Sequence, residues 1–136
     1  MARILAFDYG TKRTGIAKTD PFQMIATALE TVPTHTALDY IEKYLAQEEV
    51  EAFVLGEPKQ MDGSFSESYK YVKSFAKQLR KKFPHIPLHW EDERFTSKMA
   101  KATLLASGLP KQKRKDKSLL DSTAAVIILQ SYLNSI

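Results

Sequence analysis

The order of its apolar segments constrains the fold of this chain more than any other feature. Residues 3–8 form a run that is apolar on both faces, which is typical of a strand at the centre of a sheet. Residues 16–19 and 25–32 alternate apolar and polar positions, and the turn Asp20-Pro21 separates them. These three segments therefore predict an antiparallel meander.

The segments that follow alternate between helix and strand patterns. Apolar runs predict strands over 52–55, ended by Gly56-Glu57-Pro58, and over 87–91. Amphipathic stretches predict helices over 37–47, from Ser66 or Ser68 to about Phe83, over 97–106 and over 118–133, with Thr34 or Thr36 capping the first. The order predicts an α/β fold: a mixed sheet of three antiparallel strands and then alternating α and β, with helices on both faces.

Composition limits the class of protein. A chain of 136 residues with 43% hydrophobic content fits a single domain over residues 1–136. Zero cysteine excludes a disulfide framework, a thiol nucleophile and a Cys-ligated zinc site. The net charge of +4 mildly favours a polyanionic partner. No apolar stretch reaches the roughly 20 residues of a membrane helix, and the first residues do not resemble a secretion signal, so we expect a cytoplasmic protein with no membrane association.

Three acidic residues occupy positions that solubility does not explain. Asp8 ends the first strand, and Glu93 follows the strand predicted over 87–91. Asp121 lies on the apolar face of the last helix, which it shares with Ala124, Ala125, Ile128, Leu129 and Tyr132. Ligands of such sheets gather beyond the strand ends, so these carboxylates are expected to meet there. An oxygen-rich pocket suits Mg²⁺ or Mn²⁺, and nearby cations point to a phosphodiester substrate. The pattern predicts a metal-dependent nuclease.

Each acid also has a structural explanation. Asp8 is a common turn residue, and Asp121 fits a variant of the capping box that begins at Ser118. Glu93 fits a solvated strand end with a local ion pair. Glu57 also follows a strand and is a reserve candidate, although it equally fits an exposed turn before Pro58.

Basic residues near the acids are candidate substrate contacts. Lys12 and Arg13 follow Asp8, and Arg94, which follows Glu93, has the guanidinium geometry for bidentate phosphate binding. A basic run before Asp121 is expected to contact the nucleic-acid backbone, although solvated charge runs are common: Lys111, Lys113, Arg114, Lys115 and Lys117. The cations of the helix from Ser66 or Ser68 to Phe83 are expected to form a plain solvated face, and Trp90 is expected in the core.

Four blocks in order along the chain resemble the YqgF/RuvX family, described as Holliday junction resolvases or pre-16S rRNA nucleases. These blocks are Phe7 to Ala17, Val54 to Pro58 with Met61 to Ser64, Asp92 to Ser97, and Lys117 to Tyr132. The resemblance implies an RNase H-like fold, a nuclease dependent on Mg²⁺ or Mn²⁺, and an acidic triad of Asp8, Glu93 and Asp121. The chain departs from the family at Glu57, where an apolar residue is frequent, and this departure keeps Glu57 as the reserve.

The resemblance implies a nucleic-acid substrate of one of two kinds. We expect 5′-end processing of pre-16S rRNA in ribosome biogenesis, with association to ribosomal particles. The assignment of junction DNA as the substrate rests on fold analogy, which is weaker support. The chain is expected to be a monomer or a weak dimer, and symmetric junction cleavage would need the dimer. Two alternatives compete: a non-catalytic RNA-binding ribosome-assembly factor, and an ATP-binding relative of the actin fold, which needs two domains.

Overall fold

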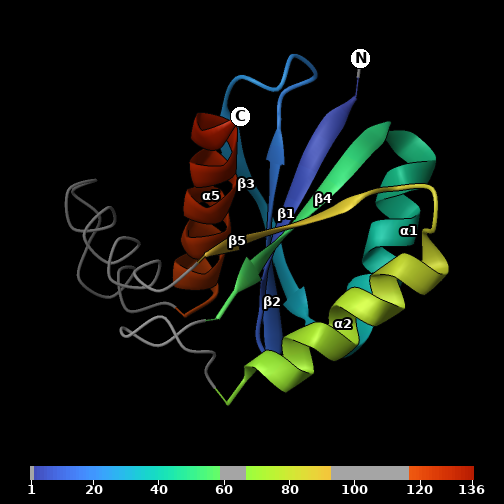
Figure 1. Cartoon of the computed structure of the whole chain (residues 1–136), viewed down its shortest axis with the longest axis vertical. Coiled ribbons are helices and arrows are strands. Elements are labelled where there is room, and N and C mark those ends of the chain that lie inside the picture. Colours follow the sequence, from blue (N-terminus) through green and yellow to red (C-terminus); the bar gives the residue numbers. More distant parts are fainter. Residues whose placement is uncertain (1, 59–66, 93–116) are drawn as a thin grey trace.

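The computed structural model describes residues 2–58, 67–92 and 117–136, with side chains from residue 123 onward in the last range. Its elements follow the predicted order (Figure 1): β1 (Arg3–Tyr9), β2 (Arg13–Thr19), β3 (Ala26–Pro33), the 3-10 turn η1 (Thr34–Thr36), α1 (Ala37–Gln47), β4 (Val50–Glu57), α2 (Tyr69–Lys82), β5 (Leu88–Asp92) and α5 (Lys117–Ser135). The helix predicted over 97–106 lies outside the described residues.

The five strands form one mixed sheet in the order β3-β2-β1-β4-β5. The pairs β1–β2 and β2–β3 are antiparallel, whereas β1–β4 and β4–β5 are parallel. The predicted meander and the central position of the first strand are therefore confirmed. Because β1 is buried on both faces, it has the continuous apolar character of a central strand.

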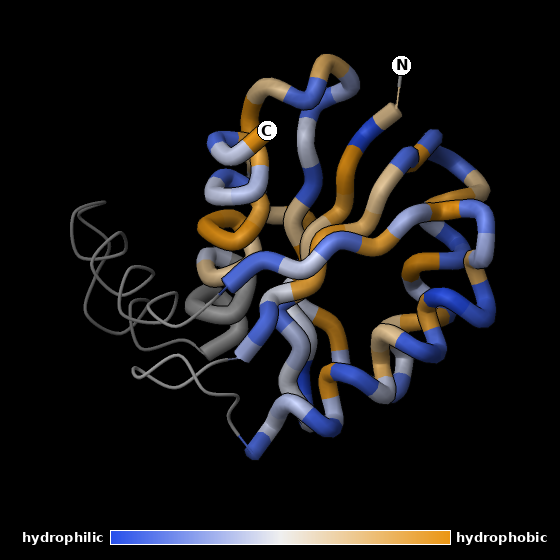
Figure 2. Tube along the Cα trace, in the orientation of Figure 1, coloured by the Kyte–Doolittle hydropathy of each residue, from blue (hydrophilic) through white to orange (hydrophobic). Residues whose placement is uncertain are grey.

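Helices cover both faces of the sheet, as predicted (Figure 1). One face packs against α1 and α2; its core includes Leu5, Phe7, Ile41, Phe53, Leu55, Phe75 and Leu79. The other face packs against α5; its core includes Ile4, Ala6, Ala17, Ala52, Val54, Ala125, Ile128 and Leu129. Figure 2 shows the apolar central strands and the largely hydrophilic α2 at the surface. The α5 face is rich in alanine, which lets the helix approach the sheet closely.

Three of the predicted capping residues, Thr34, Thr36 and Ser68, do not cap a helix, and the fourth, Ser66, lies outside the described residues. Neither Thr36 before α1 nor Ser68 before α2 makes a side-chain capping hydrogen bond. The Thr36 hydroxyl instead donates to the Pro33 carbonyl at 2.8 Å, and Thr34 binds a distant loop. Both threonines belong to η1, and Thr36 has αR backbone angles, φ -103° and ψ -1°, in place of the extended angles typical of a capping residue.

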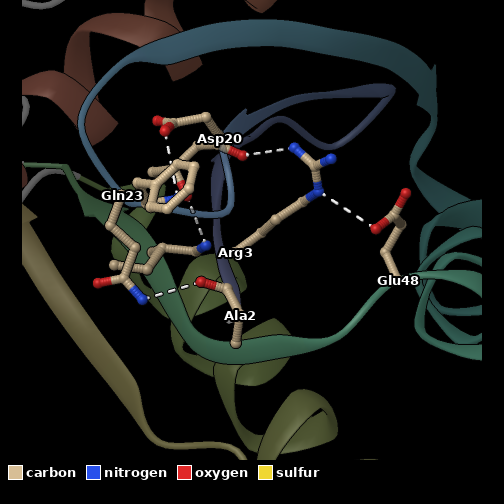
Figure 3. Close-up of polar contacts among 8 residues, drawn as sticks. Ala2, Arg3, Asp20, Gln23 and Glu48 are labelled. Carbon is tan, nitrogen blue, oxygen red and sulfur yellow. Dashed lines mark hydrogen bonds and ion pairs between the residues drawn. The ribbon is translucent and has the colours of Figure 1, made fainter.

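The turn between β2 and β3 lies at the end of the sheet where β1 begins. The Asp20 carboxylate accepts hydrogen bonds from the backbone amides of Met24 and Ile25, both at 2.8 Å. These bonds lower the pKa of Asp20. Arg3 donates to the Thr19 carbonyl at 3.0 Å and pairs with Glu48 at 3.3 Å, which ties this end of the sheet to the end of α1 (Figure 3). Among the described residues, no helix is both long enough and apolar enough to span a membrane.

Candidate active site at the carboxyl edge of the sheet

Asp8 lies near the end of β1, on the face that α5 covers. Alternate residues of a strand share a face, and Ile4 and Ala6, four and two positions earlier, pack against α5. The Asp8 side chain is half-buried. Its strand position therefore directs it to the α5 side of the sheet. We call the end of the sheet where β1, β4 and β5 finish the carboxyl edge.

Both strand neighbours of Asp8 are glycines. On β2 the residue paired with Asp8 is Gly15. On β4, Phe7 pairs with Leu55, so the next residue, Gly56, lies level with Asp8. Neither neighbour has a side chain that would occupy the space beside the carboxylate. An acid between two glycines at a strand end has room for a cation or a phosphate group.

Helix α5 begins at the end of the sheet where β1 and β4 end (Figure 1). Its buried residues include Ala124, Ala125, Ile128 and Leu129, which confirms the predicted core face. Asp121 precedes Ala124 by three residues and Ala125 by four, the spacing of one helical face. The side chains of Asp121 and of Lys117, the first residue of α5, are not among those that the structure describes.

Glu57 does not share a face with Asp8. It ends β4 two residues after Leu55, which packs against the α1 and α2 side. Asp8 and the reserve acid Glu57 thus lie on opposite faces of the sheet. On β5, Glu91 accepts a hydrogen bond from the Ser131 hydroxyl at 2.9 Å, and His89 stacks on Tyr132 at 5.3 Å. These two residues hold β5 against α5.

The loop between β1 and β2 is held by Thr34, a residue that sequence reasoning assigned to a helix cap. Its hydroxyl donates to the Gly10 carbonyl at 2.5 Å, and its amide donates to the Lys12 carbonyl at 3.0 Å. The fully buried Thr14 hydroxyl lies 2.9 Å from the Thr34 hydroxyl and is the donor there, because the Thr34 proton is already used. Two threonines therefore fix the backbone immediately after Asp8.

Gly10 is required by the tight course of this loop. A Cβ atom at Gly10 would lie 2.5 Å from the Arg13 carbonyl oxygen, well inside van der Waals contact. The clash is with backbone, so no side-chain rotation relieves it. The same loop presents Lys12, which is exposed, and Arg13, which is half-buried. Gly10 thus shapes the segment that connects the candidate acid to two candidate substrate contacts.

Several predicted site residues lie outside the described residues: Glu93, Arg94, Lys113, Arg114 and Lys115. Within the described ranges, no three His, Asp or Glu side chains form a group able to hold a metal ion. The part of the site that is described, a carboxylate between two glycines, offers one of the oxygen ligands that a hard divalent cation prefers.

Aromatic contacts hold α2 close to the carboxyl edge. Tyr9, which directly follows Asp8, packs on Phe75 with ring centroids 4.9 Å apart. Tyr69 stacks on Trp90 at 5.8 Å. Trp90 is partly buried and packs against the core, in agreement with the prediction.

Comparison with known proteins adds three findings. The family model RuvX, described as Holliday junction resolvase, matches residues 2–135. A protein of Porphyromonas gingivalis named "Putative pre-16S rRNA nuclease" is 55% identical over 99% of this chain and 98% of its own length. One of Flavobacterium johnsoniae with the same name is 52% identical, with the same coverage.

Two solved structures share the fold. The Holliday junction resolvase of fowlpox virus superposes with a TM-score of 0.61 at 13% identity, over 98% of this chain and 99% of its own. RuvC of T. thermophilus, solved in complex with a Holliday junction substrate, superposes with a TM-score of 0.59 at 17% identity, over 99% and 96%. The sheet and helices thus have the RNase H-like fold, as predicted.

Proposed function

The chain belongs to the RuvX family, and from this membership we propose that it is a metal-dependent nuclease acting in 5′-end processing of pre-16S rRNA. Hydrolysis of phosphodiester bonds is the activity of the family. The RNA substrate is supported by the name of relatives that share more than half of its residues over nearly the whole chain. The solved resolvases share the fold at much lower identity.

The observation that carries the proposal is the position of Asp8. It stands at the end of the central strand, between Gly15 and Gly56, and faces the helix that contains Asp121. Its placement at a glycine-flanked strand end is explained by a role in binding a charged ligand.

We assign Asp8, Glu93 and Asp121 as the residues that would hold Mg²⁺ or Mn²⁺. Glu93 directly follows Asp92, the last residue of β5, and Glu91 of that strand contacts α5. Glu57 is disfavoured because it ends β4 on the opposite face. When bound, such an ion supplies an activated water and stabilises the leaving oxygen.

The basic residues of the site would hold the RNA backbone. Lys12 and Arg13 lie in the loop that Thr34 and Gly10 hold in place, directly after Asp8. Arg94 and the cations of the segment 111–117 are assigned the same task, with a salt-dependent contribution to affinity. We propose that residues 1–136 act as one domain in the cytoplasm, as a monomer or weak dimer that associates with precursor ribosomal particles.

Cleavage of two substrates side by side tests the proposal. A 5′-extended 16S precursor RNA and a four-way DNA junction are each incubated with the protein and Mn²⁺ or with EDTA. We expect trimming of the RNA with Mn²⁺ and none with EDTA. Cleavage of the junction alone would instead establish a resolvase, and binding of RNA without cleavage of either substrate would establish an assembly factor.

A further inference from the structure

Helix α2 concentrates positive charge that the proposed site does not use. Its sequence contains six cations and no acid: Lys70, Lys73, Lys77, Arg80, Lys81 and Lys82. The whole chain has a net charge of only +4. The rest of the chain therefore has an excess of two acidic residues, so α2 alone contributes more positive charge than the whole chain has in net.

Four of these cations form one exposed row, which we call the α2 stripe: Lys70, Lys73, Lys77 and Arg80. They are spaced by three or four residues, so they lie on one helical face. The opposite face contains Val72, Phe75, Ala76 and Leu79, all buried against the sheet. At a rise of about 1.5 Å per residue the stripe is about 15 Å long. A surface depression of about 410 Å³ runs along it, lined also by Ser74.

Among the described residues, neighbouring acids do not pair with the stripe. Lys82, on another side of the helix, pairs with Glu42 at 2.9 Å and with Asp39 at 3.7 Å. In the described part of the chain, no acid forms an ion pair with any stripe cation. The ammonium groups of Lys70 and Lys73 lie over the rings of Tyr71 and Tyr69, at 5.0 and 5.6 Å from the centroids. Like charges at this spacing repel one another, and a bound polyanion relieves that repulsion.

The stripe starts at the edge of the sheet that carries Asp8. Tyr69, the first residue of α2, stacks on Trp90 near the end of β5. Phe75 contacts Tyr9, the residue after Asp8, at 4.9 Å. The helix then leads away from this edge (Figure 1). The stripe therefore begins at the end of the sheet that carries Asp8, on the opposite face, so a strand of phosphates that passes over this end from Asp8 would reach it.

We propose that the α2 stripe is a second binding surface for the phosphate backbone, which holds single-stranded precursor RNA outside the site of cleavage. The inference rests on the proposed function, and it replaces the plain solvated face expected from the sequence. Positively charged grooves that follow the backbone are the usual means of binding single strands. The exposed Tyr71 ring, beside Lys70 at the start of the stripe, offers a surface on which a base can stack.

The test compares two double variants that remove the same charge. K73Q/K77Q alters the stripe, and K18Q/K43Q alters β2 and α1, away from it. Affinity for a single-stranded RNA with the 5′-extension sequence is measured in EDTA at several salt concentrations. A single-strand contact contributes about 0.7 to the slope of log affinity against log salt, so losing two contacts lowers the slope by about 1.4. At 0.1 M salt this corresponds to a loss of about 25-fold.

The outcomes separate this inference from the proposed function. A reduced slope in K73Q/K77Q, with K18Q/K43Q close to wild type, supports the stripe. Equal slopes in both variants and the wild type overturn it, even if the wild type cleaves RNA. If the wild type does not cleave RNA but K73Q/K77Q still lowers the slope, the nuclease proposal is refuted and the stripe is supported. Melting temperatures establish that each variant is folded, and K70Q/R80Q tests the two ends of the stripe should K73Q/K77Q fail to fold.

Discussion

Replacing Gly10 by alanine tests whether the loop after Asp8 is fixed by close backbone packing. The new Cβ would lie 2.5 Å from the Arg13 carbonyl oxygen, whereas ordinary contact begins near 3.4 Å. The loop must therefore open by about 0.9 Å. Overpacking of this size costs about 1–3 kcal/mol. The displaced backbone contains the Gly10 carbonyl that Thr34 binds and the chain that leads out of Asp8.

The free-energy cost converts into a measurable shift of melting temperature. A chain of 136 residues has an unfolding entropy of about 0.29 kcal/mol/K at roughly 2.1 cal/mol/K per residue. The Gly10→Ala protein should then melt about 3–10 °C below wild type in differential scanning calorimetry. Its RNA cleavage should fall as well, because Asp8 and Lys12 are no longer held in their relative positions.

Thr11→Ala is the matched control, since Thr11 is an exposed residue of the same loop. Such surface substitutions stay within about 0.5 kcal/mol. If Gly10→Ala melts within a degree of wild type and cleaves RNA normally, the argument that Arg13 closes the loop against Gly10 is refuted.

Three further substitutions probe contacts that hold the fold together. Thr34→Val should cost about 1–3 kcal/mol in urea denaturation, because the Gly10 carbonyl and the Thr14 hydroxyl lose their partner; an unchanged midpoint would contradict this. Ile128→Ala should cost about 2–5 kcal/mol, because Ile128 is 1% exposed where α5 packs on the sheet; a smaller loss would mean that α5 repacks. Asp20→Asn should lower the melting temperature at neutral pH. Backbone amides lower the pKa of Asp20 in the folded protein, so its carboxylate stabilises the fold at pH values above the unfolded-state pKa near 3.8. This stabilisation is lost as pH falls through the lower pKa of the folded state. A difference in melting temperature from wild type that persists below that pH range would contradict the assignment.

Much of the fold followed from local patterns in the sequence. Residues 3–8 are apolar on both faces and form the central strand, and the spacing of Ala124, Ala125, Ile128 and Leu129 correctly defined the core face of α5. These features depend on the burial of neighbouring residues in one element. Hydrophobic periodicity reports such burial directly.

Features that depend on contacts between elements could not be predicted. β4 is apolar on both faces, so hydrophobicity did not reveal that Glu57 and Asp8 lie on opposite sides of the sheet. Thr34 precedes a helix and fitted a cap, yet it binds Gly10, 24 residues earlier. The charges of α2 were visible, but the absence of an ion pair between the stripe and an acid among the described residues depends on the tertiary structure.

The central claim is that Asp8, between Gly15 and Gly56, is the acid on which metal-dependent cleavage depends. The most direct measurement is Mn²⁺-dependent cleavage of the 5′-extended 16S precursor by Asp8→Asn, with Glu57→Gln as the matched acid variant on the opposite face of the same edge. We predict that Asp8→Asn loses cleavage while keeping its fold and its RNA binding, and that Glu57→Gln cleaves like wild type. Cleavage retained by a folded Asp8→Asn protein, or lost in Glu57→Gln alone, would contradict the account.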